Sequence, residues 1–214
     1  KQGVLPDAKV LEVGTGTGSH LRLLQELGFQ NVIGVDNSDE AIDFCRQKGL
    51  GNVQTGDIYQ LPFAADSFQL ILATDILEHV QEDGRALLEL KRVLATDGWL
   101  IITVPAFQGL WGLQDEVAHH QRRYRLQPLQ ILLAEVGLSC QVSFYFNYLL
   151  FVPIWVARQL IRIFKIRLNS ENQVNTPWLN RVLTWIFEVD VKSAPVLRPP
   201  FGVSILAVVS KPKS

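Results

Sequence analysis

The sequence predicts an α/β fold: a doubly wound, Rossmann-like, mostly parallel sheet of seven strands, with a helical insertion before the last strand. From residue 9 to residue 104, short apolar runs alternate with segments of helical periodicity, the pattern of repeated β–α–β units. A glycine-rich turn follows the first run, at the edge where open α/β sheets bind ligands. The 214 residues suffice for one such domain, so we expect residues 1–214 to form a single domain.

The first five strands are predicted from apolar runs that end in polar or glycine-rich turns. These runs are residues 9–13, 31–35, 52–55, 68–74 and 99–104. The segments after the first, second and fourth strands carry apolar residues at three- and four-residue spacing, so each can bury one helical face on the sheet. They are residues 18–27, 38–48 and 82–94, with Ser38 as the N-cap of the second.

The pattern changes after Pro105. Residues 105–124 are rich in Gly, His and aromatic side chains, and we expect an irregular loop at the functional edge of the sheet. A helix is predicted over residues 127–137, followed by paired strands over residues 138–147 and 201–210. Between these strands, residues 148–195 form the predicted helical insertion, which includes Trp155, Trp178 and Trp185.

Composition narrows the class of protein. A hydrophobic content of 48% and a net charge of -1 favour a soluble globular protein and argue against a nucleic-acid partner. Cys45 and Cys140 lie far apart inside apolar patterns, which predicts two buried thiols in a reducing compartment. No signal peptide is visible, so we expect a cytoplasmic protein.

The glycine turn reads E-x-G-x-G-x-G from Glu12 to Gly18. A dinucleotide-binding turn needs a glycine three residues after Gly16, where this chain has Ser19, and a phosphate loop needs a lysine directly after Gly18. Glycines without a Cβ let the backbone pass close to a ligand, and the carboxylate of Glu12 would attract a cationic group but repel a pyrophosphate. The turn therefore favours a nucleoside with a cationic tail.

The ordered motifs over residues 8–105 resemble those of the class I S-adenosylmethionine-dependent methyltransferases. The resemblance implies S-adenosylmethionine as cofactor and S-adenosylhomocysteine as product. Asp36 would accept hydrogen bonds from both ribose hydroxyls. Asp57 would bind the adenine amine, and Ile58 would stack on the ring. The implied cofactor-binding residues are Glu12, Gly14, Thr15, Gly16, Gly18, Asp36, Asn37, Asp57, Ile58 and Thr74.

Methyl transfer from a sulfonium mainly requires alignment of two partners, because the donor already carries the leaving-group charge. Where the acceptor must lose a proton, the candidate catalytic residues are His79, His119 and Tyr124. The alternatives are that His79 packs a helix start and that residues 119–124 are a solvated charged loop. His119 and His120 are adjacent, but no third ligand stands at a recognisable spacing, so we expect no metal ion.

Arg122 and Arg123 in the same loop could clamp a phosphate or carboxylate of the acceptor. Residues 105–124 and the apolar segment after them also resemble a subgroup of methyltransferases of bacterial glycan and envelope biosynthesis. That resemblance implies an acceptor such as a sugar or a lipid-linked intermediate. We expect a small-molecule acceptor or a lipid-linked glycan acceptor, methylated at oxygen. The alternatives are a catalytically silent cofactor-binding or docking module, and a nicotinamide oxidoreductase, which Ser19 disfavours.

Residues 148–168 join an apolar run to a helix that carries Arg158, Arg162, Lys165 and Arg167. The run is too short and interrupted to span a bilayer, but a basic amphipathic helix can lie on an anionic membrane. We therefore consider a peripheral contact with the inner face of the membrane. The favoured alternative is a lid or homodimer helix whose apolar face packs on the domain.

Overall fold

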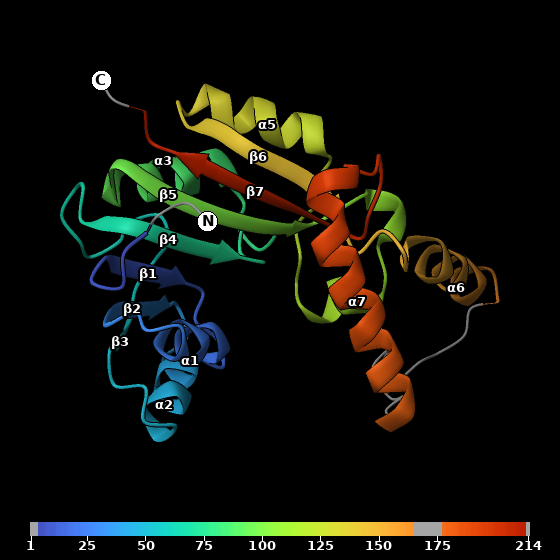
Figure 1. Cartoon of the computed structure of the whole chain (residues 1–214), viewed down its shortest axis with the longest axis horizontal. Helices are drawn as coiled ribbons and strands as arrows, with labels where there is room; N and C mark the ends of the chain where they lie inside the picture. The colour runs from blue at the N-terminus through green and yellow to red at the C-terminus, as the bar shows by residue number, and fades with distance from the viewer. Residues whose placement is uncertain (1–3, 165–176, 213–214) are drawn as a thin grey trace.

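The computed structural model describes residues 4–164 and 177–212 and contains one seven-stranded sheet (Figure 1). The strands are β1 (Lys9–Val13), β2 (Asn31–Asp36), β3 (Val53–Thr55), β4 (Phe68–Thr74), β5 (Leu94–Pro105), β6 (Ser139–Phe146) and β7 (Ser204–Ser210). Their order is β3-β2-β1-β4-β5-β7-β6. The first five strands pair in parallel, and β7 lies antiparallel between β5 and β6. This confirms the predicted fold class.

Helices cover both faces of the sheet. They are α1 (Ser19–Glu26), α2 (Asp39–Gln47), α3 (Asp83–Val93) and α5 (Leu126–Glu135). Apolar residues of α1 and α2 pack on one face with Val10 of β1, whereas those of α3 and α5 pack on the other with Leu11 and Val13. Because successive side chains of a strand point to opposite faces, this alternation gives the sheet two cores. Ser38 caps α2 as predicted, its hydroxyl accepting a hydrogen bond from the Ala41 amide (3.2 Å).

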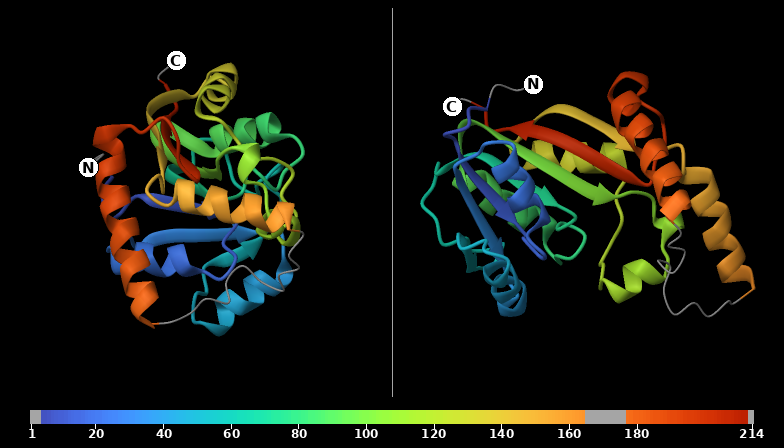
Figure 2. Two further views of the ribbon diagram at one scale, coloured as in Figure 1. Left: turned by 90° about the vertical axis from the view of Figure 1, so that its right-hand side faces the viewer. Right: turned by 60° about the horizontal axis from the view of Figure 1, so that its bottom comes forward.

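The insertion consists of α6 (Phe151–Ile163) and α7 (Pro177–Leu197), and both extend beyond the end of the sheet where β5 finishes (Figures 1 and 2). Asp190 of α7 is fully buried and accepts hydrogen bonds from the Asn147 and Leu149 amides, which anchors α7 to the end of β6. None of the residues of α6 is buried. Its half-buried Phe151 nevertheless packs against Phe107 and Phe201, with ring centroids 5.6 and 5.1 Å apart, in line with the favoured expectation of an apolar face on the domain. A role of this helix as a lid or in a homodimer stays a prediction.

The basic residues predicted for this helix differ in their surroundings. Arg158 is only 12% exposed and lies 3.6 Å from the Asp115 carboxylate, so it faces the domain. Arg162 is exposed, and Lys165 and Arg167 lie outside the described residues. Across the described ranges, no helix combines the length and apolar character that crossing a membrane requires.

Two expectations are corrected. The segment after Pro105 contains a 3₁₀ turn, η1 (Gln108–Leu110), and a short helix, α4 (Leu113–Val117). Asp115 stabilises the start of α4 by accepting a hydrogen bond from the Gly112 amide (2.8 Å), a cap that the irregular composition concealed. Cys45 is buried as expected, but Cys140 is exposed because its strand, β6, is the edge of the sheet.

Candidate active site

A cavity of about 590 Å³ opens at the carboxyl ends of β1, β2 and β3, within the range of small-molecule sites. Its floor is the glycine turn after β1, and the turn after β4 forms the opposite wall. Seven of the residues predicted from the sequence line it: Gly14, Gly16, Asp36, Asn37, Asp57, Ile58 and His79. Eight further residues complete the lining and were not selected from the sequence: Val13, Val35, Gly56, Tyr59, Ile76, Val80, Gln81 and Glu82.

The three glycines of the turn all have positive φ, but they differ in what a side chain at each position would contact. A Cβ atom at Gly14 would lie 1.8 Å from the Ile76 side chain, and one at Gly18 would lie 2.4 Å from Leu50. These two glycines make room for the protein's own side chains. A Cβ at Gly16 would meet only the Gly14 carbonyl oxygen, at 4.0 Å. Gly16 is therefore the position where bare backbone faces open space in the cavity.

We expect alanine substitutions at Gly16 and Gly18 to have different effects, one mainly on cofactor binding and the other mainly on stability. Gly18→Ala adds overpacking against Leu50 to an unfavourable left-handed φ, and should lower the free energy of unfolding by roughly 2–5 kcal/mol. Gly16→Ala carries only the φ cost of roughly 1–2 kcal/mol, but its methyl group enters the cavity and should weaken cofactor binding. Urea denaturation and calorimetry on both variants test this. Equal losses of stability would contradict it.

Asp36 organises the turn as well as lining the cavity. One carboxylate oxygen accepts a hydrogen bond from the Gly16 amide (2.8 Å) and the other from the Ser38 amide (3.0 Å). A carboxylate oxygen can accept more than one hydrogen bond, so both remain able to bind ligand hydroxyls. Asp57 is similar, with one oxygen accepting from the Tyr59 amide (2.9 Å).

Glu12 and Thr74 meet behind the cavity through a residue that the sequence analysis did not select. His20 Nδ1 lies 3.0 Å from Glu12 Oε1 and 3.2 Å from the Thr74 hydroxyl. Glu12 is 1% exposed, and its Oε2 has no hydrogen-bond partner among the described residues. Burial raises the pKa of Glu12 from 4.5 to about 8. Thr15, also buried, ties the turn to the Val35 carbonyl (3.3 Å). These residues support the cavity from behind.

Glu12 should make stability depend on pH. Between pH 4.5 and about 8 the folded protein holds a proton that the unfolded chain has released, so stability falls as pH rises through this window. Glu12→Gln removes this dependence and should be more stable than the parent at pH 8 by on the order of a few kcal/mol. Urea denaturation at pH 5 and pH 8 measures the difference. An identical gap between variant and parent at both pH values would rule out this titration.

Residues 11–102 match the model of a methyltransferase domain. The uncharacterized methyltransferase YcgJ of Bacillus subtilis is 33% identical over 123 residues, which are 55% of this chain and 48% of that protein. The sterol 24-C-methyltransferase of Yarrowia lipolytica is 30% identical over 105 residues, 46% of this chain and 28% of that protein. Residues 11–102 therefore form a methyltransferase domain of the class I S-adenosylmethionine-dependent type. The chain spans less than half the length of either relative.

The fold agrees with this family. A solved complex between the Haloferax volcanii Trm112 methyltransferase activator and a methyltransferase superposes with a TM-score of 0.67 at 18% identity, covering 99% of this chain and 85% of the other. S-adenosylmethionine is the cofactor of class I methyltransferases, and the cavity fits it. The open backbone at Gly16 leaves room for a flat ligand, and a cationic tail bound near Glu12 would favour the ionised form of this buried acid.

His79 follows β4 and lies on the wall opposite the glycine turn. The ring of His79 lies edge-on to that of His120, with centroids 4.7 Å apart. Burial lowers the pKa of His79, and the nearby His120 lowers it further. His79 is therefore a neutral imidazole at neutral pH. It is the one predicted catalytic residue that lines the cavity.

The other two predicted catalytic residues lie apart from the cavity. His119 is exposed at the end of α4, in a left-handed conformation with φ 55°. Tyr124 is buried, and its hydroxyl lies 3.0 Å from the Leu77 carbonyl oxygen and 2.9 Å from an Asp83 carboxylate oxygen. Burial, together with Asp83, raises the pKa of Tyr124 far above its usual range. This environment suits a structural hydrogen bond.

The two arginines of the loop are held within the protein. Arg122 contacts Asp83 at 3.1 Å, and Arg123, 4% exposed, binds the Asp115 carboxylate through two nitrogens at 2.7 and 2.9 Å. The expectation that Arg123 clamps the acceptor is therefore wrong, because its guanidinium is committed to a buried ion pair.

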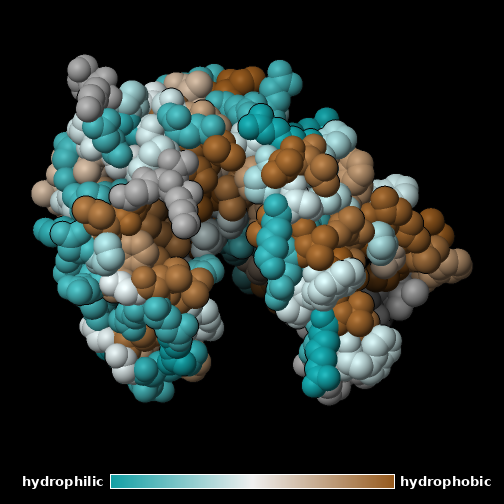
Figure 3. All heavy atoms as spheres, viewed as in Figure 1, coloured by the Kyte–Doolittle hydropathy of each residue, from teal (hydrophilic) through white to brown (hydrophobic). Residues whose placement is uncertain are grey.

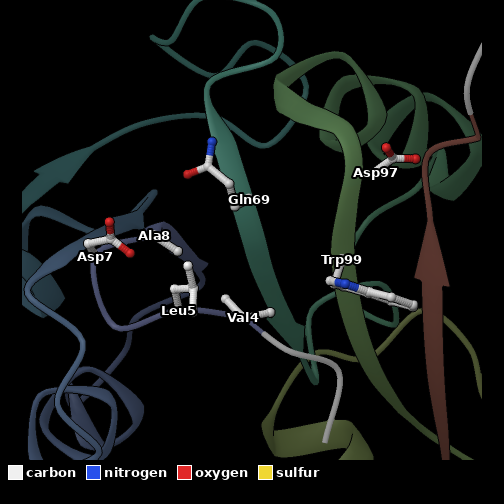
Figure 4. Close-up of a pocket in the computed structure, with 7 residues that line it drawn as sticks. All are labelled: Val4, Leu5, Asp7, Ala8, Gln69, Asp97 and Trp99. Carbon is white, nitrogen blue, oxygen red and sulfur yellow. The ribbon is translucent and has the colours of Figure 1, made fainter.

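A second hollow of about 350 Å³ lies at the opposite, amino-terminal edge of the sheet (Figure 4). Gln69 on its rim accepts a hydrogen bond from the Lys9 amide (2.8 Å), which holds the start of β1. Ligands of open α/β sheets bind at the carboxyl ends of the strands, so we place the functional site at the other cavity.

Proposed function

We propose that this chain transfers a methyl group from S-adenosylmethionine to an oxygen of a small-molecule or lipid-linked acceptor, such as a lipid-linked glycan. In this reaction the methyl C–S bond breaks, a C–O bond forms, and the acceptor hydroxyl releases its proton to water or to the His79 imidazole. The observation that supports it is one cavity holding Gly16 and Asp36 on one wall and the neutral imidazole of His79 on the other. A cofactor held by the first wall would present its methyl group toward the second.

We assign the cofactor contacts to the residues that line this cavity. Asp36 and Asn37 would bind the ribose, and Asp57 and Ile58 the adenine, while Gly16 lies under the amino-acid tail. Four further residues stabilise the glycine turn from behind the cavity wall: Glu12, Thr15, Gly18 and Thr74. When bound, the cofactor supplies an electrophilic methyl group on a sulfonium.

The test is formation of S-adenosylhomocysteine in the presence of hydroxylated small molecules and lipid-linked glycans. His79→Ala should lower turnover by roughly 10²–10⁴-fold and leave the affinity for S-adenosylmethionine unchanged, because His79 faces the acceptor end. Tight cofactor binding without a methylated product from any acceptor of the panel would favour the second candidate, a catalytically silent cofactor-binding or docking module.

We further propose that α6 and α7 bring this protein to its acceptor at the inner, cytoplasmic face of a membrane. Large apolar side chains stand exposed along both helices, including Trp155 (45%), Ile163 (69%) and Trp185 (65%), and Figure 3 shows hydrophobic surface gathered on this side. Exposed apolar patches rimmed by polar residues mark interaction sites, and Trp favours the membrane interface.

Vesicle sedimentation tests this contact. The protein should bind phosphatidylglycerol vesicles, and replacing Trp155 and Ile163 by serine should release it, because these side chains are exposed and carry no core packing. Replacing Leu23, an exposed residue of α1 remote from the insertion, is the matched control. Wild-type protein that ignores vesicles but sediments as a dimer in the ultracentrifuge would show that a second copy covers this face instead.

A further inference from the structure

Three side chains that can bind a metal ion converge beside the cofactor cavity. One ligand atom from each of Glu78, His79 and His120 lies within 4.8 Å of the others. Two atoms that both bind an ion at about 2.1 Å can stand up to about 4.2 Å apart, so a few tenths of an ångström of movement would close the set. The chain brings these groups together from two segments, the turn after β4 and the end of α4.

The environment of Glu78 is that of a metal-binding carboxylate. Its side chain is fully buried, and neither carboxylate oxygen has a hydrogen-bond partner in the part of the chain that the structure describes. The neighbouring cation, Arg123, directs its hydrogen bonds to Asp115 and to the Ala106 carbonyl. A buried carboxylate is normally paired or binds a metal, because its desolvation costs several kcal/mol.

His120 is held in the orientation that a metal-binding histidine needs. Its Nδ1 lies 2.9 Å from Asp115 Oδ1, which leaves Nε2 free to bind an ion. Asp115 is itself fully buried and fixed by Arg123 and the Gly112 amide. A carboxylate that orients the second nitrogen of a histidine is the usual outer shell of a metal site.

The backbone fixes the distance between the two segments. The Gln121 amide donates a hydrogen bond to the Glu78 carbonyl (2.6 Å), directly beside His120 and His79. Backbone contact between the segment after α4 and the turn after β4 therefore positions the three side chains, in addition to their own conformations.

We propose that Glu78, His79 and His120 bind one divalent transition-metal ion at the acceptor end of the cavity. Two imidazoles and one carboxylate suit Zn²⁺, Mn²⁺ or Fe²⁺, and three protein ligands leave coordination positions open, as at catalytic sites. Because His79 lines the cavity, a ligand in the cavity could reach the open positions of such an ion. This inference rests on the proposed function only in assigning those positions to an oxygen of the acceptor. His79 then acts as a ligand rather than as a base.

The expectation of no metal ion came from the sequence, where no third ligand stands near His119 and His120. The missing ligands lie about forty residues earlier, so only the folded chain joins them to His120. His119, the obvious second histidine of the pair, is not part of the cluster.

The experiment is titration of the chelator-treated full chain with Zn²⁺ by calorimetry and with Mn²⁺ by electron paramagnetic resonance. We expect one ion per chain. Glu78→Gln and His120→Ala should each lower the affinity more than about 100-fold, above the effect of losing an orienting partner. His119→Ala is the matched control and should bind the ion like the parent. Absence of binding, or equal binding by all variants, would overturn the proposal.

Thermal unfolding with and without Zn²⁺ separates a ligand from a merely structural residue. Glu78→Gln removes an unpaired buried acid, so the variant without metal should melt no lower than the parent, while only the parent should gain stability from Zn²⁺. A variant stabilised by Zn²⁺ as much as the parent would contradict the assignment.

Cofactor binding is measured in parallel, so that the two proposals fail separately. Mn²⁺ bound at the site should broaden the ¹³C-methyl resonance of bound S-adenosylmethionine, because both occupy one cavity. Bound Mn²⁺ that leaves this resonance sharp would overturn the placement of the site. Metal and cofactor binding together without product from any acceptor would refute the proposed function and leave the metal site standing.

Discussion

Replacing Asp36 with alanine should lower the affinity for S-adenosylmethionine at least about 100-fold, the largest effect on binding that we expect from a single residue. Each hydrogen bond from a ligand to a charged group contributes roughly 1.5–3 kcal/mol, and Asp36 is placed to accept two from the ribose. The same carboxylate holds the Gly16 and Ser38 amides, so the variant also loses the preorganised turn. Calorimetry with S-adenosylmethionine and with S-adenosylhomocysteine measures the loss.

Asp43→Ala is the matched control for this change. Asp43 lies on α2, close to Asp36 in sequence, but its carboxylate is exposed and pairs with Arg46 on the surface (3.1 Å). This variant should bind both ligands like the parent. If Asp36→Ala retains parental affinity, the cavity at the glycine turn is not the cofactor site, and the assignment of every residue lining it falls.

Asp115→Ala should be the most destabilising of the substitutions considered. Asp115 and Arg123 form a buried pair with 0% and 4% of their side chains exposed, and removing the acid leaves an unpaired buried cation. Such a loss costs about 3–5 kcal/mol, which for a chain of this size lowers Tm by roughly 6–20 °C. Differential scanning calorimetry tests it, again with the exposed Asp43→Ala as reference, where the loss should stay below about 1 kcal/mol.

A second substitution shows whether the cause is the unpaired cation. Combining Asp115→Ala with Arg123→Met removes both charges, and the double variant should recover part of the lost stability. Burial acts to raise the pKa of Asp115, but hydrogen bonds from Arg123, Gly112 and His120 outweigh it and hold this pKa below 3.8. The stability that Asp115 contributes is therefore present above pH 4 and is lost as pH falls. A double variant no more stable than Asp115→Ala would contradict this account.

The cofactor side could be read from the sequence because its residues are close together along the chain. Gly16 lies in the turn after β1, Asp36 is the last residue of β2, and Asp57 lies two residues after β3. Parallel strands bring their carboxyl ends to one edge, so a local motif at each strand end already determines a common site. The glycines show the limit of this reasoning, since the missing Cβ atoms of Gly14 and Gly18 make room for Ile76 and Leu50 rather than for a ligand.

By itself the sequence determined the doubly wound sheet, the helical insertion before β7 and the nucleoside-binding edge, because strand periodicity and strand-end motifs are local properties of the chain. Only the tertiary structure decided the acceptor side. It brought Glu78 close to His120, paired Arg123 and Arg158 with Asp115, and left Trp155 and Ile163 of α6 exposed. These contacts depend on how the loop after β5 and the insertion dock on the sheet, and no spacing along the chain records that docking.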